Sequence, residues 1–501
     1  MKKIAAGSFV ILIGIVLSLL LVRPQQNVEF VIAHTNDHHG YCWSRKDKGG
    51  FAKQSTLLKN IRTEFKNVLL LSGGDINTGA PEADLNQGKP SFIGMNFLKF
   101  DAMALGNHEF DNSLEYLKQQ AQWADFPFLA SNVFEAASGE RLFQPYFIMK
   151  MSGVRVAIIG AVTEDSAFIS NVKTTDQLRF TSAVAEIAKV YESIKNKADL
   201  FIAVTHMGFN PSEMTLSDPY TGKGEIALAR AVPALHVIVG GHSHTLLKEP
   251  FQVSQTLILQ AKHYAEYLGE LHLQWSNKNK KVESWRYTSH PLDEKIQEDE
   301  EMLAVLKPYK DKVEVLLKEP VGETLVELSS ANVRENEASL GNLVTDIYQE
   351  VTGADVALQN GGGIRSSIEK GAITYGDILR TFPFGNTIAV FELKGRDLKK
   401  ILERSAGLHR PSGAFLQVSG LTLKIRGPQL LSVLFNNKPL EMEKLYKVAT
   451  NSFIANGGDG YEDFKKFSYR DTGYVDAAVI KKYIEGYSPI HPKIEKRIQI
   501  L

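Results

Sequence analysis

The chain has 501 residues, of which 44% are hydrophobic and 23% are charged. This length exceeds what one hydrophobic core ordinarily supports, so we expect two domains. Basic and acidic residues balance at 57 each. That balance argues against a nucleic-acid polymer as partner, but a local Arg cluster could still bind a small anion. Cys42 is the one cysteine, which excludes an intramolecular disulfide; we interpret it as a buried filler rather than a metal ligand.

The N-terminus has the features of an export segment. Lys2 and Lys3 precede an apolar run over residues 4–22, which ends at Arg23 and Pro24. A basic start followed by an apolar stretch is typical of export. The run is near the length that crosses a bilayer, and no small-x-small cleavage site follows it. We therefore expect residues 1–24 to be an uncleaved anchor rather than a cleaved signal peptide. The rest of the chain would then lie in the periplasm or on the outer face of the membrane.

Strands and helices alternate along the first half of the chain. β-branched and apolar runs that break into polar loops predict strands at 28–33, 68–71, 154–162, 200–204 and 237–239. Helical patterns lie between them at 51–65, 113–124, 183–195 and 225–231. This alternation predicts an α/β layered domain. Such folds place their sites where strands end, and polar residues gather there in this sequence.

A second α/β region follows a charged stretch at 293–318, which we interpret as a helical connector. Helices are expected at 341–351 and 475–485, and strands at 354–358, 387–393 and 418–425. The predicted organisation is therefore a first domain at 25–292, a helical linker at 293–320 and a second domain at 321–501. We see neither an internal repeat nor a low-complexity segment.

Residues suited to binding divalent metals follow the strands of the first domain. Asp37 and His39 are two residues apart, as are His242 and His244, and in extended backbone such pairs point to one side. The other candidates are Asp75, Asn107, His108, Asp111 and His206. Carboxylate, imidazole and amide oxygen together suit Zn, Mn or Co. A single His is more often structural than a ligand, as we assume for His290 and His409, but ligand types at the ends of successive strands are not expected by coincidence.

These motifs resemble the calcineurin-like metallophosphoesterase signature. The phrases Thr35-Asn-Asp-His-His-Gly40, Gly73-Gly-Asp-Ile-Asn-Thr-Gly79 and Gly106-Asn-His-Glu-Phe-Asp111 are more specific. They resemble the 5′-nucleotidase family, and within it the bacterial periplasmic enzymes that also hydrolyse UDP-sugars. The resemblance covers nearly the whole chain after residue 24. It implies an N-terminal four-layer α/β/β/α domain and a C-terminal α/β substrate-binding domain.

The resemblance also implies two divalent metal ions. Asp37, His39 and His244 would bind one, Asn107, His206 and His242 the other, and Asp75 would bridge them. The near relatives carry Gln at the place of His244, so metal preference could differ here. Two such cations can activate water and clamp a phosphoryl group for in-line attack. His108, oriented by Asp111, would stabilise charge or protonate the leaving oxygen. On sequence alone, Asp111 could cap the following helix, either in place of orienting His108 or in addition to it.

Residues of the second domain suit a nucleotide. Asn360-Gly-Gly-Gly-Ile-Arg365 follows a strand; the Gly run alone could be a tight turn, but with Arg365 it predicts an anion site. Arg334 could add a second guanidinium. Phe384 and Phe453 lie in Gly- and Asn-rich loops and could stack on a base, although an isolated Phe is usually core. By the resemblance, Asn386 and Gly413 join Arg334, Asn360 and Arg365 around phosphate and ribose, Phe384 and Phe453 clamp the base, and Asp459 contacts the nucleoside. The near bacterial relatives have a further Arg where this chain has Ser330, which implies weaker phosphate contact there.

The predicted activity is hydrolysis of nucleoside 5′-monophosphates to nucleoside and phosphate, together with UDP-sugar cleavage. A 2′,3′-cyclic nucleotide phosphodiesterase is the alternative enzyme. A thiosulfate-processing dimanganese relative fits less well, because paired Phe and Arg365 suit a base and a phosphate. A surface nucleotide-binding protein without activity is the non-enzymatic alternative, although every expected ligand position holds a competent residue. No protein partner is implied.

Overall fold

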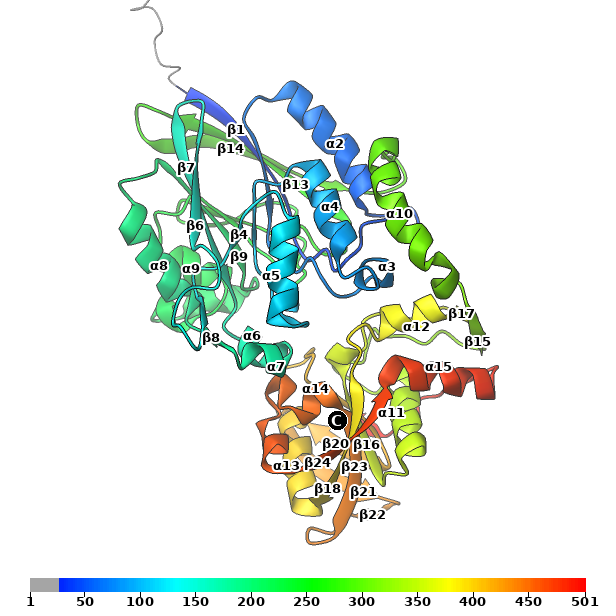
Figure 1. Ribbon diagram of the computed structural model, residues 1–501. Helices are drawn as coiled ribbons and strands as arrows, with labels where there is room; N and C mark the ends of the chain where they lie inside the picture. The colour runs from blue at the N-terminus through cyan, green and yellow to red at the C-terminus, as the bar shows by residue number, and fades with distance from the viewer. Residues whose placement is uncertain (1–26) are drawn as a thin grey trace, which may run out of the picture.

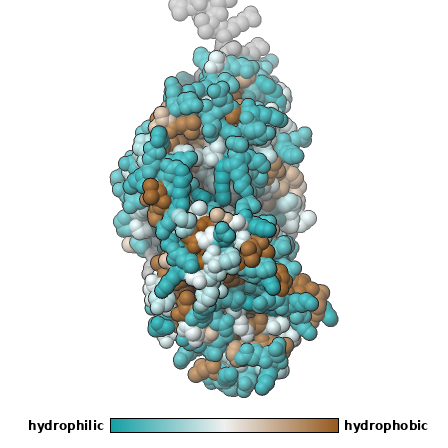
Figure 2. Space-filling model, turned by 90° about the vertical axis from the view of Figure 1, so that its right-hand side faces the viewer, coloured by the Kyte–Doolittle hydropathy of each residue, from teal (hydrophilic) through white to brown (hydrophobic). Residues whose placement is uncertain are grey.

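The computed structural model describes residues 27–501, so the predicted anchor or signal at 1–24 lies outside the described residues. Among the residues that it describes, no helix is long and apolar enough to cross a membrane. The chain forms two layered halves (Figure 1). Residues of both halves line one cavity. The face seen in Figure 2 is largely hydrophilic, with scattered apolar groups.

The N-terminal half contains two six-stranded sheets. The first has the order β14-β13-β1-β2-β3-β4 and the second the order β11-β12-β10-β9-β7-β6. In the first sheet, β1 to β4 run parallel, and β13 and β14 pair antiparallel at one end. In the second sheet, β12, β10, β9 and β7 run parallel, and the edge strands β11 and β6 are antiparallel. The strands of the first sheet are β1 (Asn27–Thr35), β2 (Val68–Ser72), β3 (Ala102–Ala104), β4 (Phe128–Leu129), β13 (Tyr267–Ser276) and β14 (Lys281–Pro291). Those of the second are β6 (Tyr146–Met151), β7 (Val154–Val162), β9 (Leu200–His206), β10 (Val237–Val239), β11 (Phe251–Val253) and β12 (Thr256–Leu259).

Strand β1 shows how alternation builds the layers. Phe30 and Ile32 pack in a core between the two sheets, whereas Val31 and Ala33 pack in a core against helices. A buried strand must be apolar on both faces to do this, which explains its continuous apolar run. The helices on the first sheet are α2 (Phe51–Glu64), α4 (Lys89–Leu98), α5 (Leu114–Trp123) and α10 (Glu300–Leu317). Helices α8 (Ala183–Ile194) and α9 (Glu225–Ala231) cover the second sheet, which gives the predicted α/β/β/α order.

The C-terminal half is built on a five-stranded sheet of order β19-β16-β23-β18-β24. One face packs on α11 (Ser339–Thr352), α12 (Tyr375–Thr381) and α15 (Asp476–Tyr487), and the other on α13 (Gly395–Ala406) and a four-stranded sheet, β22-β21-β20-β25. The strands of the five-stranded sheet are β16 (Val356–Asn360), β18 (Thr387–Lys394), β19 (Leu416–Ser419), β23 (Leu445–Asn451) and β24 (Tyr469–Val475). Those of the smaller sheet are β20 (Leu421–Arg426), β21 (Gln429–Phe435), β22 (Lys438–Pro439) and β25 (Ile498–Ile500).

Two expectations from the sequence were incomplete or wrong. The single strand expected at 418–425 is two strands, β19 and β20, which belong to different sheets. Gly420 separates them with a φ of +78°, a conformation that breaks the strand. The long antiparallel hairpin of β13 and β14 was not predicted at all. The charged connector is helical over α10, as expected, and α10 packs against α2, α3 (Pro81–Asp84) and α4 of one half and α12 of the other.

Candidate active site between the two halves

The predicted metal ligands all follow the carboxyl ends of parallel strands. Asp37 and His39 follow β1, Asp75 follows β2, and Asn107 follows β3. His206 ends β9 in the other sheet, and His242 and His244 follow β10. Because the two sheets stack with these ends together, the loops converge at one place. The side chains form overlapping groups: Asp37, His39 and His244; His39, Asp75 and His108; and Asp37, Asp75 and His206.

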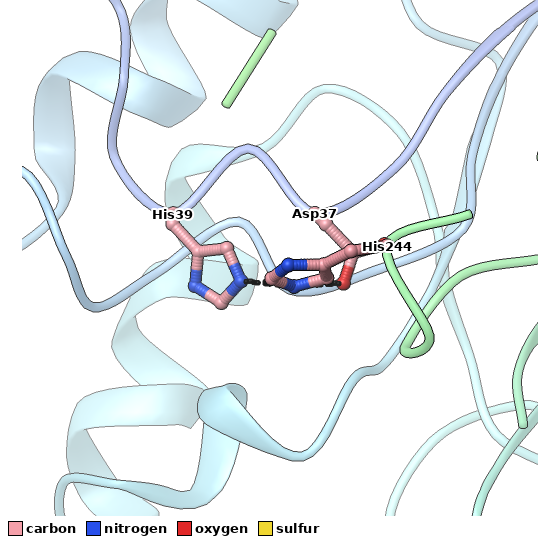
Figure 3. A group of neighbouring side chains, drawn as sticks. All are labelled: Asp37, His39 and His244. Carbon is pink, nitrogen blue, oxygen red and sulfur yellow. Dashed lines mark hydrogen bonds and ion pairs between the residues drawn. The ribbon is translucent and has the colours of Figure 1, made fainter. Parts of the chain in front are cut away.

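The first group places two ring nitrogens face to face (Figure 3). His39 Nε2 lies 3.1 Å from His244 Nε2, and His244 Nε2 lies 3.2 Å from Asp37 Oδ1. His39 Nδ1 donates to the carbonyl of Thr78 at 2.9 Å, which leaves the lone pair on Nε2. Burial holds the pKa of His39 well below its usual value. A neutral nitrogen and a carboxylate converging in this way fit a divalent cation.

A second set of donors, Asp75, Asn107, His206 and His242, lies beside the first. Burial opposes protonation of His206, but the carboxylates of Asp75 and Asp37 outweigh it and raise its pKa to about 10, so a cation bound here would replace a proton of this ring. His206 Nδ1 donates to the carbonyl of Gly73 at 2.7 Å, and its Nε2 lies 3.0 Å from Asp75 Oδ2 without a hydrogen bond. His242 Nδ1 lies 3.0 Å from Asn107 Oδ1. Burial lowers the pKa of His242 to about 4, so this ring is neutral. These donors suit a second cation of the Zn, Mn or Co type. Asp75 Oδ2 is also 3.8 Å from His39 Nε2, so its carboxylate lies between the two groups.

The backbone of the ligand loops is strained rather than extended. Asp37 and His39 have φ of 54° and 50°, Asp75 has 55°, and His242 and His244 have 77° and 54°. Non-glycine residues in this region cost about 1–3 kcal/mol each and cluster at functional sites. The sequence led us to assume that each pair of ligands points to one side because its backbone is extended, and this assumption was wrong. The side chains converge because each loop turns sharply.

Two buried carboxylates that the sequence analysis missed hold these loops. Glu109 accepts hydrogen bonds from the backbone N–H groups of Asp75, Ile76 and Gly106 at 2.6–3.0 Å. Glu225 accepts from the backbone N–H of Gly208 at 3.0 Å. Glu109 lies inside the motif at 106–111, so a carboxylate next to the candidate ligands could have indicated its role from the sequence. Nothing in the sequence near Glu225 indicates its role.

His108 and Asp111 form the predicted pair. His108 Nδ1 lies 2.6 Å from Asp111 Oδ2. Burial opposes protonation of His108, but the carboxylates of Asp111 and Asp75 outweigh it and raise its pKa. The alternative role of Asp111 as a helix cap is wrong, because α5 begins at Leu114 and Ser113 accepts from the N–H of Tyr116. Cys42 is buried, as expected, with its Sγ 3.4 Å from Ser91 Oγ.

The C-terminal half brings two guanidinium groups towards the metal-ligand loops. Burial and then the charge of Arg365 lower the pKa of Arg334 to about 10. Among the described residues neither Arg334 nor Arg365 forms an ion pair. Arg365 also contributes to the lowered pKa of His39, so its charge is felt at the ligand loops. Two unneutralised guanidinium groups next to such loops suit a phosphate.

The remaining predicted substrate residues line one cavity of about 870 Å³ with the groups above. Asn360 Nδ2 donates to Asp459 Oδ2 at 2.8 Å, and Gly413 accepts from the N–H of Gly362 at 2.7 Å. The Phe384 ring stacks on His108 at 5.8 Å, across the boundary between the halves. The predicted residues on the cavity wall are Asp75, Asn107, His108, Asp111, His242, His244, Arg334, Asn360, Arg365, Phe384, Asn386, Gly413, Phe453 and Asp459. Asp37, His39 and His206 are fully buried behind them.

One wall of this cavity was not predicted. Phe168 and Ile169, from α6 (Ser166–Ile169) of the N-terminal half, line it opposite the loop that carries Asp459. Ser170 Oγ donates to the carbonyl of Asn107 at 2.8 Å, which ties this wall to the ligand loop. Ser330, at the place of the missing Arg, instead pairs with Ser367 Oγ at 3.1 Å and does not line the cavity.

Comparisons with known proteins agree with this arrangement. Residues 30–246 match the calcineurin-like phosphoesterase family, and residues 320–466 match the 5′-nucleotidase C-terminal domain. The chain is 36% identical to Protein UshA of Yersinia enterocolitica, over 93% of each chain. It is also 36% identical to a 5′-nucleotidase of Vibrio cholerae, over 93% of this chain and 92% of the relative. The crystal structure of a 5′-nucleotidase precursor from Thermus thermophilus superposes with a TM-score of 0.86 at 30% identity, covering 95% of this chain and 99% of that one. The chain therefore belongs to the 5′-nucleotidase family of calcineurin-like phosphoesterases, and it is a hydrolase that acts on nucleotides.

Proposed function

We propose that this enzyme hydrolyses nucleoside 5′-monophosphates to nucleoside and phosphate, and that it also cleaves UDP-sugars. The observation that carries the proposal is the single cavity, which has metal-ligand loops on one wall and Arg334, Arg365 and two phenylalanines on the other. A phosphate held between these walls leaves its base next to Phe384 and Phe453. Stacking of a base on an aromatic ring is worth about 1–3 kcal/mol.

The chemistry is divided among named residues. Two divalent cations, held by Asp37, His39, Asp75, Asn107, His206, His242 and His244, would supply activation of water and charge stabilisation at phosphorus. Arg334 and Arg365 bind the phosphate oxygens and orient them. His108 donates Nδ1–H to Asp111, and the nearby carboxylates raise the pKa of the ring, which favours the imidazolium with a second proton at Nε2. It donates that proton to the leaving oxygen as the bond to phosphorus breaks.

The nucleoside end is bound by the C-terminal half. Phe384 and Phe453 clamp the base, and Asp459, which Asn360 holds at 2.8 Å, accepts hydrogen bonds from the ribose. Asn386 and Gly413 complete this end of the cavity. We further propose domain limits of 25–292 and 321–501 around a linker at 293–320. The basic and apolar character of residues 1–24 supports export to the periplasm or to the outer face of the cell membrane.

Hydrolysis of 2′,3′-cyclic nucleotides is the second candidate activity, since it would use the same metal ligands. A binding protein without activity is disfavoured by the converging ring nitrogens and carboxylates of the ligand groups.

The test is phosphate release from AMP by the chain starting at Gln25, after EDTA treatment and then with Mn, Co or Zn added back. Release that returns with metal supports the proposal, and parallel assays with UDP-glucose and 2′,3′-cyclic AMP define the range. If AMP and UDP-glucose stay intact with every metal while the cyclic nucleotide is cleaved, the alternative holds. If none is cleaved, the protein is not a nucleotidase under this scheme.

A further inference from the structure

An ion pair joins the two halves at a place where neither side chain is freely solvated. Arg380, on α12, donates from Nη1 to Glu82 Oε1, on α3, at 3.0 Å. The two side chains are only 15% and 23% exposed. Arg380 Nη2 also lies 3.4 Å from Asp377 Oδ1. Separating this pair would leave the Arg380 guanidinium partly desolvated without its carboxylate partner, which costs more free energy than separating an exposed pair. The contact therefore restrains the relative position of the two halves more strongly than an exposed pair would.

On the Glu82 side, the ion pair is joined directly to a metal-ligand loop. Helix α3 follows the loop of Asp75, and the N–H of Ala80 donates to the carbonyl of His39 at 2.9 Å. The N–H of Gly79 donates to Asp84 at 2.9 Å. A Cβ on Gly40 would lie 2.9 Å from the Cβ of Ala83, so α3 packs against the loop of His39 without space to shift. Movement of Glu82 therefore carries the ligand loops with it.

On the Arg380 side, the ion pair is joined to the phosphate and base loops. The next residue, Thr381, accepts at its carbonyl from the N–H of Arg365 at 2.9 Å. Phe382 is buried, and Phe384 follows two residues later to stack on His108. The guanidinium of Arg365 lies 5.8 Å from the Phe384 ring. Arg380 is thus next to the point from which both proposed substrate contacts extend.

We propose that the Glu82–Arg380 ion pair fixes the position of one wall of the active site relative to the other, with Arg380 as a positioning residue for phosphoryl transfer. This inference rests on the proposed function, because it assumes that substrate binds on one wall and reacts on the other. A shift of about 1 Å between the two walls is enough to slow a reaction by about 100-fold. The Lys46–Glu369 pair, at 2.6 Å, also joins the halves. Its side chains are 70% and 71% exposed, so we expect it to contribute little.

The test compares Arg380→Met, Glu82→Gln and the double variant with a Lys46→Met/Glu369→Gln control, all in the full chain loaded with Mn. With AMP, kcat is expected to fall about 10- to 100-fold in the single variants while KM changes little, because Arg334, Arg365 and the phenylalanines remain on their own wall. The loss of kcat in the double variant should not exceed that of the more severe single variant, because the two side chains would act through one shared contact. The control should match the wild type. Hydrolysis of p-nitrophenyl phosphate, which has a phosphate for Arg334 and Arg365 but no base for the phenylalanines, should fall less than that of AMP in each variant.

Unchanged AMP kinetics in Arg380→Met would overturn the proposal, as would equal losses on AMP and p-nitrophenyl phosphate, which would indicate damage to the metal-ligand loops. If the wild type does not hydrolyse AMP, the proposed function has failed, and the ion pair is then judged from distances between spin labels. Labels at Gln119→Cys and Lys482→Cys lie on exposed positions of the two halves. Arg380→Met should broaden the distance distribution and the control should not; equal distributions would reject the ion pair as a restraint.

Discussion

At the scale of single residues, the site combines strained backbone with side chains that have one free coordinating atom. His39 and His206 each use Nδ1 to donate to a backbone carbonyl, which directs Nε2 into the site. Asp37 and His39 keep left-handed φ values that an unconstrained loop would avoid. Glu109 offsets part of this cost by accepting the backbone N–H groups of the next ligand loop. The ligand positions are therefore fixed before any cation binds.

The proposed roles of His108 and Asp111 in proton donation can be tested by mutation, with the nearby Ser113 as a control. Replacing His108 with Ala should reduce kcat for AMP by about 10²–10⁴-fold, because the proton donor to the leaving oxygen is lost. Asp111→Asn should give a smaller loss, since the ring keeps a hydrogen-bond partner but loses the charge that raises its pKa. Both are measured by steady-state phosphate release. Ser113→Ala is the control, because it removes a helix cap worth about 1 kcal/mol and should leave kcat unchanged; a similar kcat loss in that variant would contradict the assignment.

A buried acid next to a cavity residue, with its backbone N–H donating to the carbonyl of Asn386 at 2.8 Å, predicts how stability depends on pH. Burial raises the pKa of Asp476 from 3.8 to about 7. The folded state therefore binds a proton more tightly than the unfolded state, and this group contributes a loss of stability as pH rises from about 4 to 7, with no further change above. Asp476→Asn keeps the acceptor for the N–H of Ala477 and should flatten this slope. Urea unfolding at pH 5 and pH 8 should show the variant gaining relative stability at pH 8, and an unchanged difference between the two pH values would contradict the prediction.

At the scale of secondary-structure elements, one glycine decides which sheet a segment joins. β19 pairs with β16 in the five-stranded sheet, and β20 pairs with β21 in the smaller sheet. A Cβ at Gly420, which lies between them, would approach the carbonyl oxygen of Asp355 to 2.2 Å. The apolar pattern over 418–425 is continuous, so it could not reveal that the chain changes sheets there.

Gly420→Ala should therefore destabilise the fold by more than its left-handed φ alone explains. Gly473, in β24, has φ of +70°, and a Cβ added there would meet no atom of the described residues within 4 Å, so Gly473→Ala carries the conformational cost only. That cost is about 1–2 kcal/mol. We expect Gly420→Ala to exceed it by at least about 1 kcal/mol in urea unfolding. Equal midpoints for the two variants would show that the backbone near Asp355 shifts without cost.

At the scale of the whole molecule, the two halves share one cavity, and neither half contains a complete site. The loops proposed to bind metal belong to the N-terminal half, whereas Arg334, Arg365 and the loops proposed to bind the base belong to the C-terminal half. Helix α10 contacts elements of both. Division of a site between two bodies allows substrate binding to assemble the catalytic arrangement.

Metal binding should be measurable as stability of the whole molecule, separately from activity. A cation that binds the folded chain stabilises it by RT ln(1 + [L]/Kd). EDTA should lower Tm, and added Mn or Zn should raise it with concentration. Asp75→Asn should weaken this response, because Asp75 Oδ2 lies 3.8 Å from His39 Nε2 and 3.0 Å from His206 Nε2 and would serve both cations. His290→Gln is the control, since His290 contacts Glu270 away from the site; an equal loss of the metal response there would argue against the assigned ligands.

The family to which the chain belongs could be predicted from the amino-acid sequence, because motifs such as the one at 106–111 are local. The loops that we propose for the chemistry were also found there, because residues of metal-ligand type follow apolar strands. The same reading predicted β7 and β10 to the residue, since continuous apolar runs mark buried strands. Which atoms meet was settled by the folded molecule alone. The left-handed turns at Asp37 and His39, the support from Glu225, the wall at Phe168 and the Glu82–Arg380 pair depend on contacts between residues far apart in sequence. No local pattern encodes such contacts, because they arise from packing of one sheet or one half against the other.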